Sequence, residues 1–134
     1  MTVICADPDQ RELRRLRRIL RRVVPRAAVH CCRDPDEAAE LARSKGCDVL
    51  FTEVNFSGRG DGITLAETVK AAHPRVNLIF MTPKDYRAGD YEGFKTWELF
   101  PSGWFTKPCT EERLTREFIN LRYPAERKEK EEIT

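Results

Sequence analysis

A short apolar run that ends in a carboxylate constrains the fold of this chain more than any other feature. Residues 47–62 read CDVLFTEVNFSGRGDG, in which the apolar run at 49–51 precedes Glu53 and a glycine-rich loop. An unbroken apolar run of this length is typical of a strand buried on both faces of a parallel sheet. Because ligands of open α/β sheets bind just outside the carboxyl ends of the strands, Glu53 is a candidate site residue.

Strand-like and helix-like segments alternate along the whole chain. Short apolar runs predict strands over residues 2–6, 27–32, 49–53, 76–81 and 103–106. Apolar residues at helical spacing predict helices over residues 10–24, 35–45 and 63–72, another in the second half of 84–102, and a last one from near Thr110 to before Pro124. Five strands alternating with five helices predict an α/β fold, a doubly wound five-stranded parallel sheet with helices on both faces.

Capping signals mark where these helices begin and end. The sequence DPDQ at residues 7–10 predicts that Asp7 caps the first helix, with Pro8 in the first helical position. The sequence DPDE at residues 34–37 repeats this signal for the second helix, and Gly46 is its natural end. The glycines at 58, 60 and 62 are expected to be turn residues.

Composition and charge exclude several classes of protein. The 134 residues are 40% hydrophobic and 34% charged, which suits one domain, placed at residues 1–123, with a charged tail or linker at 124–134. The net charge of +2 gives little support for nucleic-acid binding, and no membrane-spanning run or signal-type amino terminus is seen, so a cytoplasmic location is expected. Five cysteines without CxxC spacing favour reduced, buried thiols over disulfides or zinc.

Four polar residues fall at the carboxyl ends of predicted strands. Asp7 follows the first strand, Glu53 ends the third, Thr82 follows the fourth and Lys107 follows the fifth. Because the ends of parallel strands converge at one edge of the sheet, these side chains are expected to meet there. Two carboxylates, a hydroxyl and an ammonium are the groups that would hold a phosphoryl group together with a cation.

The same segments resemble the receiver domains of two-component response regulators over about residues 3–122. The resemblance rests on VICAD, CDVLFTEVNFSGRGDG, LIFMTP and GWFTKP, in this order and at this spacing. It implies the flavodoxin-like (βα)5 receiver fold, with Glu53 at the position of the phosphoacceptor aspartate. It also implies that Thr82 and Lys107 are the switch hydroxyl and the family's lysine, which precedes a cis proline. Trp104 matches the aromatic residue that rotates inward on activation.

Two departures from the family pattern weaken phosphoryl transfer. Glu53 is one methylene longer than the aspartate it replaces. In the register that helix periodicity favours, Asp7 matches the first acid of the pair that binds Mg²⁺ and Pro8 stands at the position of the second. A shift of one residue would place Ala6 on the first acid and Asp7 on the second, so one acid is missing in either register, and Asp9 is the acid that would partly replace it. Weak Mg²⁺ binding at Asp7 is expected, and no other cofactor. Since this chemistry needs positioning and charge neutralisation by the metal, the chain looks like a pseudo-receiver in which Glu53 carries negative charge toward Lys107.

The expected function is that of an atypical receiver. It would be a phosphorylation-independent protein-interaction module in two-component signal transduction, without enzymatic activity. Two alternatives stay open. The chain would still accept a phosphoryl group and act in a phosphorelay, or Cys31 and Cys32 would form a thiol redox sensor, although neighbours on a strand point to opposite faces.

Two surfaces are candidates for partner binding. Phe94, Trp97 and Phe100, in the face formed by residues 94–105, are expected to bind a signalling protein or a second copy of the chain. The first helix carries arginines that suit an acidic partner better than nucleic acid. They are Arg11, Arg14, Arg15, Arg17, Arg18, Arg21 and Arg22.

Each candidate residue also has a purely structural explanation. Asp7 would serve only as a helix cap, and Glu53 with Lys107 would form only an ion pair, as happens in many folds without function. Thr82 would be an ordinary β-branched strand residue. Trp104 would belong to the core or to a partner surface rather than to a moving switch.

Overall fold

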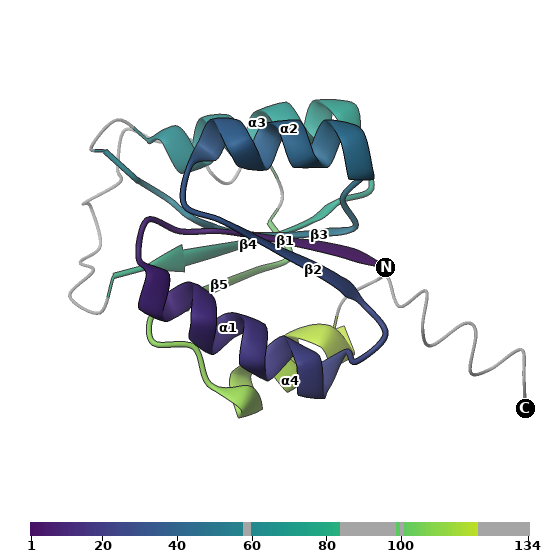
Figure 1. Cartoon of the computed structure of the whole chain (residues 1–134), viewed down its shortest axis with the longest axis vertical. Coiled ribbons are helices and arrows are strands. Elements are labelled where there is room, and N and C mark those ends of the chain that lie inside the picture. The colour runs from purple at the N-terminus through teal and green to yellow at the C-terminus, as the bar shows by residue number, and fades with distance from the viewer. Residues whose placement is uncertain (58–59, 84–98, 100, 121–134) are drawn as a thin grey trace, which may run out of the picture.

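The computed structural model describes residues 1–57, 60–83, 99 and 101–120. Its centre is a five-stranded sheet of parallel strands in the order β2-β1-β3-β4-β5 (Figure 1). The strands are β1 Thr2–Ala6, β2 Ala28–Cys32, β3 Val49–Glu53, β4 Asn77–Thr82 and β5 Gly103–Thr106. All five predicted strands are confirmed, and none of their bounds moves by more than one residue.

Within the described residues, four helices cover the two faces of the sheet in pairs. Helices α2 Pro35–Lys45 and α3 Asp61–Ala72 lie on one face, and α1 Gln10–Val23 and α4 Glu111–Asn120 lie on the other (Figure 1). This is the doubly wound arrangement predicted by the alternating sequence. The helix predicted in the second half of residues 84–102 falls almost wholly outside the described residues, as do residues 124–134. No helix in the described part of the chain is long and apolar enough to cross a bilayer.

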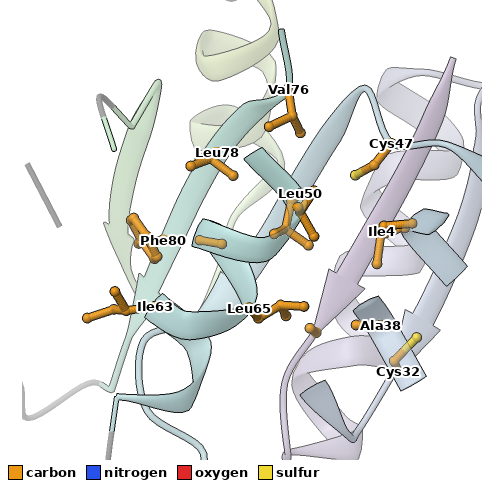
Figure 2. Close-up of a cluster of buried hydrophobic side chains, with 14 of the residues drawn as sticks. Ile4, Cys32, Ala38, Cys47, Leu50, Ile63, Leu65, Val76, Leu78 and Phe80 are labelled. Carbon is orange, nitrogen blue, oxygen red and sulfur yellow. The ribbon is translucent and has the colours of Figure 1, made fainter. Parts of the chain in front are cut away.

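Alternate residues of the central strands enter two separate hydrophobic cores. From β1, Val3 and Cys5 face α1 and α4, whereas Ile4 faces α2 and α3. The strands β3 and β4 alternate in the same way, and Leu50 and Phe80 lie in the core under α2 and α3 (Figure 2). Burial on both faces explains why these strands read as unbroken apolar runs. It also fixes the register, and therefore the position of every strand end.

The predicted start of α1 at Gln10 is confirmed, but its predicted cap is wrong. Asp9, and not Asp7, is its N-cap, because the Asp9 side chain accepts a hydrogen bond from Arg11 N at 2.9 Å. Pro8 lies before the helix and is exposed. The sequence DPDQ offers an acid at both positions, and the carboxylate of Asp7 is bound elsewhere. The predicted start and end of α2 are both confirmed.

Gly62 belongs to the first turn of α3 and not to the preceding loop. A Cβ atom at this position would lie 1.7 Å from the carbonyl oxygen of Glu53, so glycine alone allows α3 to approach the end of β3 this closely. Gly60 is the N-cap residue and has a left-handed backbone with φ of 66°. The prediction of a turn residue is therefore right for Gly60 and wrong for Gly62, while Gly58 lies outside the described residues.

Candidate functional site

The four polar residues predicted at strand ends all lie at the carboxyl edge of the sheet, where the side chains of Asp7, Glu53 and Lys107 are in contact. Asp7 follows β1, Glu53 ends β3, Thr82 ends β4 and Lys107 follows β5. The backbone N–H of Lys107 donates to the carbonyl oxygen of Thr82 at 2.8 Å, which anchors the end of β5 to the end of β4. The peptide bond between Lys107 and Pro108 is cis, as the family resemblance implies.

Lys107 links two buried carboxylates. Its Nζ lies 2.8 Å from Asp7 Oδ2 and 3.4 Å from Glu53 Oε1. Asp7 is 0% and Glu53 3% exposed, so neither carboxylate is hydrated by bulk water. The predicted proximity of Glu53 and Lys107 is confirmed, and Asp7 is the nearer partner of the lysine.

Backbone N–H groups bind the other two carboxylate oxygens. Asp9 N donates to Asp7 Oδ1 at 2.8 Å, and Asn55 N donates to Glu53 Oε2 at 2.8 Å. All four carboxylate oxygens of Asp7 and Glu53 therefore accept a hydrogen bond or ion pair from the protein itself. Asp9 contributes its backbone to this pocket, because its exposed side chain caps α1.

Burial dominates the electrostatics of this pocket. Burial raises the pKa of Asp7 and of Glu53 above their ordinary values, and hydrogen bonds from Lys107 and from Asn55 N oppose this rise only in part. Burial by itself would lower the pKa of Lys107, but the hydrogen bond to Asp7 and the two carboxylate charges raise it. The lysine is therefore held in its charged form, and two acids share one counter-charge.

These residues do not fit a Mg²⁺ site of the receiver type. Mg²⁺ requires octahedral coordination by oxygen, usually from carboxylates and water. Pro8 cannot supply a carboxylate, and the oxygens of Asp7 and Glu53 already accept from protein donors. Among the described residues, no three His, Cys, Asp or Glu side chains are grouped so as to hold a metal ion. Among the described residues, the ammonium of Lys107 is the cation that forms ion pairs with these two carboxylates.

Asp61 organises the loop that follows β3, and sequence analysis did not identify it. Its Oδ1 accepts from Phe56 N at 2.6 Å and from Ser57 N at 3.3 Å, and its Oδ2 accepts from Ser57 Oγ at 2.8 Å. Burial opposes ionisation of Asp61, but these hydrogen bonds lower its pKa. The sequence signal that could have identified Asp61 is an acidic residue in the first turn of a helix that follows a glycine-rich loop.

Thr82 lies at this edge with its hydroxyl toward β5, whereas Trp104 lies within β5 and packs against β4. Thr82 Oγ1 lies within donating distance of Phe105 O at 3.4 Å and of Thr106 Oγ1 at 3.5 Å, so its hydroxyl is turned toward β5. The ring of Trp104 packs on that of Phe80, with centroids 5.3 Å apart and an interplanar angle of 51°. The tryptophan is therefore partly buried against the sheet. The switch roles of Thr82 and Trp104 stay predictions.

The predicted partner surfaces differ in how far the structure describes them. Phe94, Trp97 and Phe100 lie outside the described residues, so the aromatic surface stays a prediction. The arginines of α1 are exposed except for Arg17, which is partly buried. Arg22 forms an exposed ion pair with Glu111 of α4 at 3.1 Å, and such pairs contribute little to stability.

Comparisons with known proteins agree with the fold. The family model described as the response regulator receiver domain matches residues 3–118. A 55-residue segment is 40% identical to the transcriptional regulatory protein RprY of Bacteroides fragilis, and it covers 41% of this chain but only 22% of that protein.

Solved structures of low sequence identity share the architecture. One is the signal receiver domain of a DNA-binding response regulator from Colwellia psychrerythraea, with a TM-score of 0.76 and 20% identity over 90% of this chain and 97% of that one. Another is the chemotaxis protein CheY4 of Vibrio cholerae, with a TM-score of 0.73 and 16% identity over 90% and 97% of the two chains. At this identity the likeness establishes the fold alone.

Proposed function

Because this chain belongs to the response regulator receiver domain family, we propose that it is a pseudo-receiver, a phosphorylation-independent protein-interaction module of two-component signalling. Glu53 stands at the phosphoacceptor position and supplies a negative charge there without being phosphorylated. The module has no catalytic activity of its own in this proposal. Its five free thiols suit the reducing cytoplasm, where we place it.

One observation carries the proposal: both oxygens of Glu53 already have the donors that a phosphoryl group at this position would use. Glu53 Oε1 pairs with Lys107 Nζ at 3.4 Å, and Glu53 Oε2 accepts from Asn55 N at 2.8 Å. A glutamate that fills these contacts stands in for a modified aspartate. We infer that the carboxyl edge is held in one state without transfer of phosphate.

The charge balance of the pocket supports the same conclusion. Transfer to a carboxylate requires neutralisation of the phosphoryl oxygens as they approach, which is mainly the work of a metal ion in this chemistry. Here Lys107 is shared between Asp7 and Glu53, and Pro8 provides no ligand. Within the part of the chain that the structure describes, a phosphoryl donor would therefore meet two buried acids whose shared cation, Lys107, is already paired with both.

Partner binding would be the output of this module. We propose that the face formed by residues 94–105 binds a signalling protein or a second copy of the chain, with the arginines of α1 as a further surface for an acidic partner. RprY is a transcriptional regulator, but the matched segment spans only 22% of it, so no output domain is assigned to this chain.

The deciding experiment is incubation with acetyl phosphate and Mg²⁺, followed by intact mass measurement. We expect no phosphoryl adduct on the unmodified protein. The Glu53→Gln variant is the matched control, because it lacks the ionised acceptor and keeps a similar shape. A Mg²⁺-dependent adduct on the unmodified chain that Glu53→Gln abolishes would overturn the proposal. It would establish the alternative of a receiver that still acts in a phosphorelay.

A further inference from the structure

Strands β1 and β2 bring two cysteines side by side. Cys5 and Cys31 are register partners in this parallel pair, and both side chains belong to the core under α1. Cys5 is fully buried, whereas Cys31 lies on the edge strand β2 and is partly exposed. The Cys31 thiol donates to the carbonyl oxygen of Leu13 in α1, at 3.9 Å. Cys32 lies in the opposite core, so the Cys31–Cys32 pair considered from the sequence does not fit the structure.

The surroundings of the two thiols give them different chemistry. A hydrogen bond from Cys5 lowers the pKa of Cys31 to about 6 against the effect of burial, and hydrogen bonding and charge from Arg17 act in the same direction. Burial raises the pKa of Cys5 well above its ordinary value. Burial also raises the pKa of the other thiols to about 12, namely Cys32, Cys47 and Cys109.

Among the five cysteines, all of which the structure describes, Cys31 is the one whose pKa is lowered, and it is the partly exposed one. The thiolate is the form of cysteine that reacts with peroxides, and reactivity requires access. Cys31 combines a lowered pKa with partial exposure to solvent. Its register partner Cys5 is buried, so peroxide would reach Cys31 first and Cys5 would react only with the oxidised Cys31.

We propose that Cys5 and Cys31 form a peroxide-sensitive pair that closes reversibly into a disulfide. The Cys31 thiolate attacks one oxygen of a peroxide, the O–O bond breaks, and Cys31 becomes a sulfenic acid while the other oxygen leaves as hydroxide. The sulfur of Cys5 then attacks the sulfur of Cys31. The S–S bond forms, and the sulfenic oxygen leaves as water with the proton of Cys5. The peroxide is reduced by the two electrons that the thiols lose.

The strand geometry allows this bond. Neighbouring strands lie about 4.8 Å apart, which falls within the Cα separation of about 4.4–6.8 Å that disulfides span. A disulfide on a partly exposed edge strand is open to attack by a dithiol reductant, which makes the step reversible.

The same bond would reach the carboxyl edge of the sheet. Asp7 follows Cys5 by two residues, and Asp7 N donates to Cys32 O at 3.1 Å. A covalent link between β1 and β2 beside this hydrogen bond would fix the backbone that carries the buried carboxylate of Asp7. Peroxide would thus act on the site through the strand pair rather than through Glu53.

Mass spectrometry of the whole chain tests the proposal. After treatment with hydrogen peroxide we expect a loss of two hydrogen atoms, a peptide map that links Cys5 to Cys31, and full reversal by dithiothreitol. In Cys5→Ala, dimedone should instead trap a sulfenic acid on Cys31. Cys109→Ala is the matched control and should keep the link. The map of the unmodified protein decides the question even if Cys5→Ala does not fold.

A link between any other two cysteines, a bond between two chains, or an unoxidised Cys31 would overturn the proposal. The pH profile of iodoacetamide labelling at Cys31 is a second test, with a midpoint expected near pH 6. Arg17→Gln should move this midpoint upward by about one pH unit because it removes a neighbouring positive charge. Arg18→Gln, at an exposed position of the same helix, should leave it unchanged. None of these measurements depends on phosphorylation.

Discussion

Lys107 donates a hydrogen bond of 2.8 Å to Asp7, a residue 100 positions earlier in the chain. This contact joins the ends of β1 and β5, which are not neighbours in the sheet. Since Asp7 is 0% exposed, the ion pair is buried on its acidic side. The lysine is thus a structural clamp as well as the partner of Glu53.

Loss of the clamp should destabilise the fold in a pH-dependent way. Lys107→Met leaves two buried carboxylates without a counter-charge, which is expected to cost about 3 kcal/mol of unfolding free energy at neutral pH. The cost should shrink as the pH falls, because Asp7 and Glu53 then take up protons and no longer need a cation. Urea denaturation at neutral and acidic pH measures both effects. Lys45→Met, at the exposed end of α2, is the control and should change little.

The raised pKa of Glu53 predicts a second pH dependence. Burial lifts this pKa above the ordinary value of 4.5, so between 4.5 and the folded-state value the folded chain holds a proton that the unfolded chain has released. The contribution of Glu53 to stability is therefore complete below 4.5 and is lost as the pH rises through the folded-state pKa. The unfolding free energy of the unmodified protein, minus that of Glu53→Gln, should fall over this interval.

Asp61→Asn is the matched control because its pKa is shifted the other way. The pKa of Asp61 is lowered in the folded state, so its contribution is present above the ordinary value of 3.8 and is lost as the pH falls. The unfolding free energy of the unmodified protein, minus that of Asp61→Asn, should therefore rise with pH. If the two free-energy differences changed with pH in the same direction and by the same amount, the assigned burial of Glu53 would be wrong.

The sequence predicted most of the fold because the strands carry strong local signals. A short apolar run without polar residues fits a strand buried on both faces better than an exposed strand or a surface helix. The two ends of α2 are marked by its caps, Asp34 and Gly46. The predicted cap of α1, Asp7, is wrong, because Asp9 takes this role. What decides between them is the contact between Asp7 and Lys107, which is a tertiary interaction that no local pattern encodes.

The candidate site was predictable as a set of residues but not as a network. Strand ends placed Asp7, Glu53 and Lys107 at one edge, and the ion pairs are consistent with that. The direction of each side chain depends on distant backbone groups, so the donors to the carboxylates could not be read from the sequence. For the same reason Gly62 was assigned to a turn, since the approach of α3 to β3 is a property of the packed structure.

Gly62→Ala should therefore destabilise the protein, although alanine is the better helix former. The added Cβ would collide with the backbone of Glu53, and a clash of this kind is expected to cost about 3 kcal/mol or more. Gly46→Ala is the control, because nothing lies within 4 Å of its Cβ and only its positive φ of 82° opposes the change. That variant should lose about 1 kcal/mol. Thermal or urea unfolding compares the two, and a harmless Gly62→Ala would contradict the close approach.

Mg²⁺ binding should be weak. The oxygens of Asp7 and Glu53 already have donors, and a cation would have to displace Lys107. Trp104 lies three residues before Lys107, so its fluorescence in a Trp97→Phe background reports on this edge. We expect no saturable quenching by Mg²⁺. Tight quenching that Asp7→Asn abolishes would show that Asp7 does bind the ion.

The last prediction is that Glu53→Asp alone does not restore efficient phosphorylation. The shorter side chain recovers the acceptor of the family and gives up its reach toward Lys107. The pocket would still lack the metal ligand at position 8, and neutralisation of the transferring group is a main part of this catalysis. Glu53→Asp combined with Pro8→Asp should be labelled faster than either single variant.

The structure makes Pro8→Asp a clean change. Pro8 is exposed and precedes the Asp9 cap, so its replacement leaves the first turn of α1 as it is. Arg33 donates to the backbone oxygen of Pro8 at 3.3 Å, and this acceptor remains when the side chain is replaced. Labelling with acetyl phosphate and Mg²⁺ then compares the two single variants with the double variant. Rapid, Mg²⁺-dependent labelling of Glu53→Asp by itself would mean that the remaining acids suffice for the metal. Glu53 alone would then keep this receiver unphosphorylated.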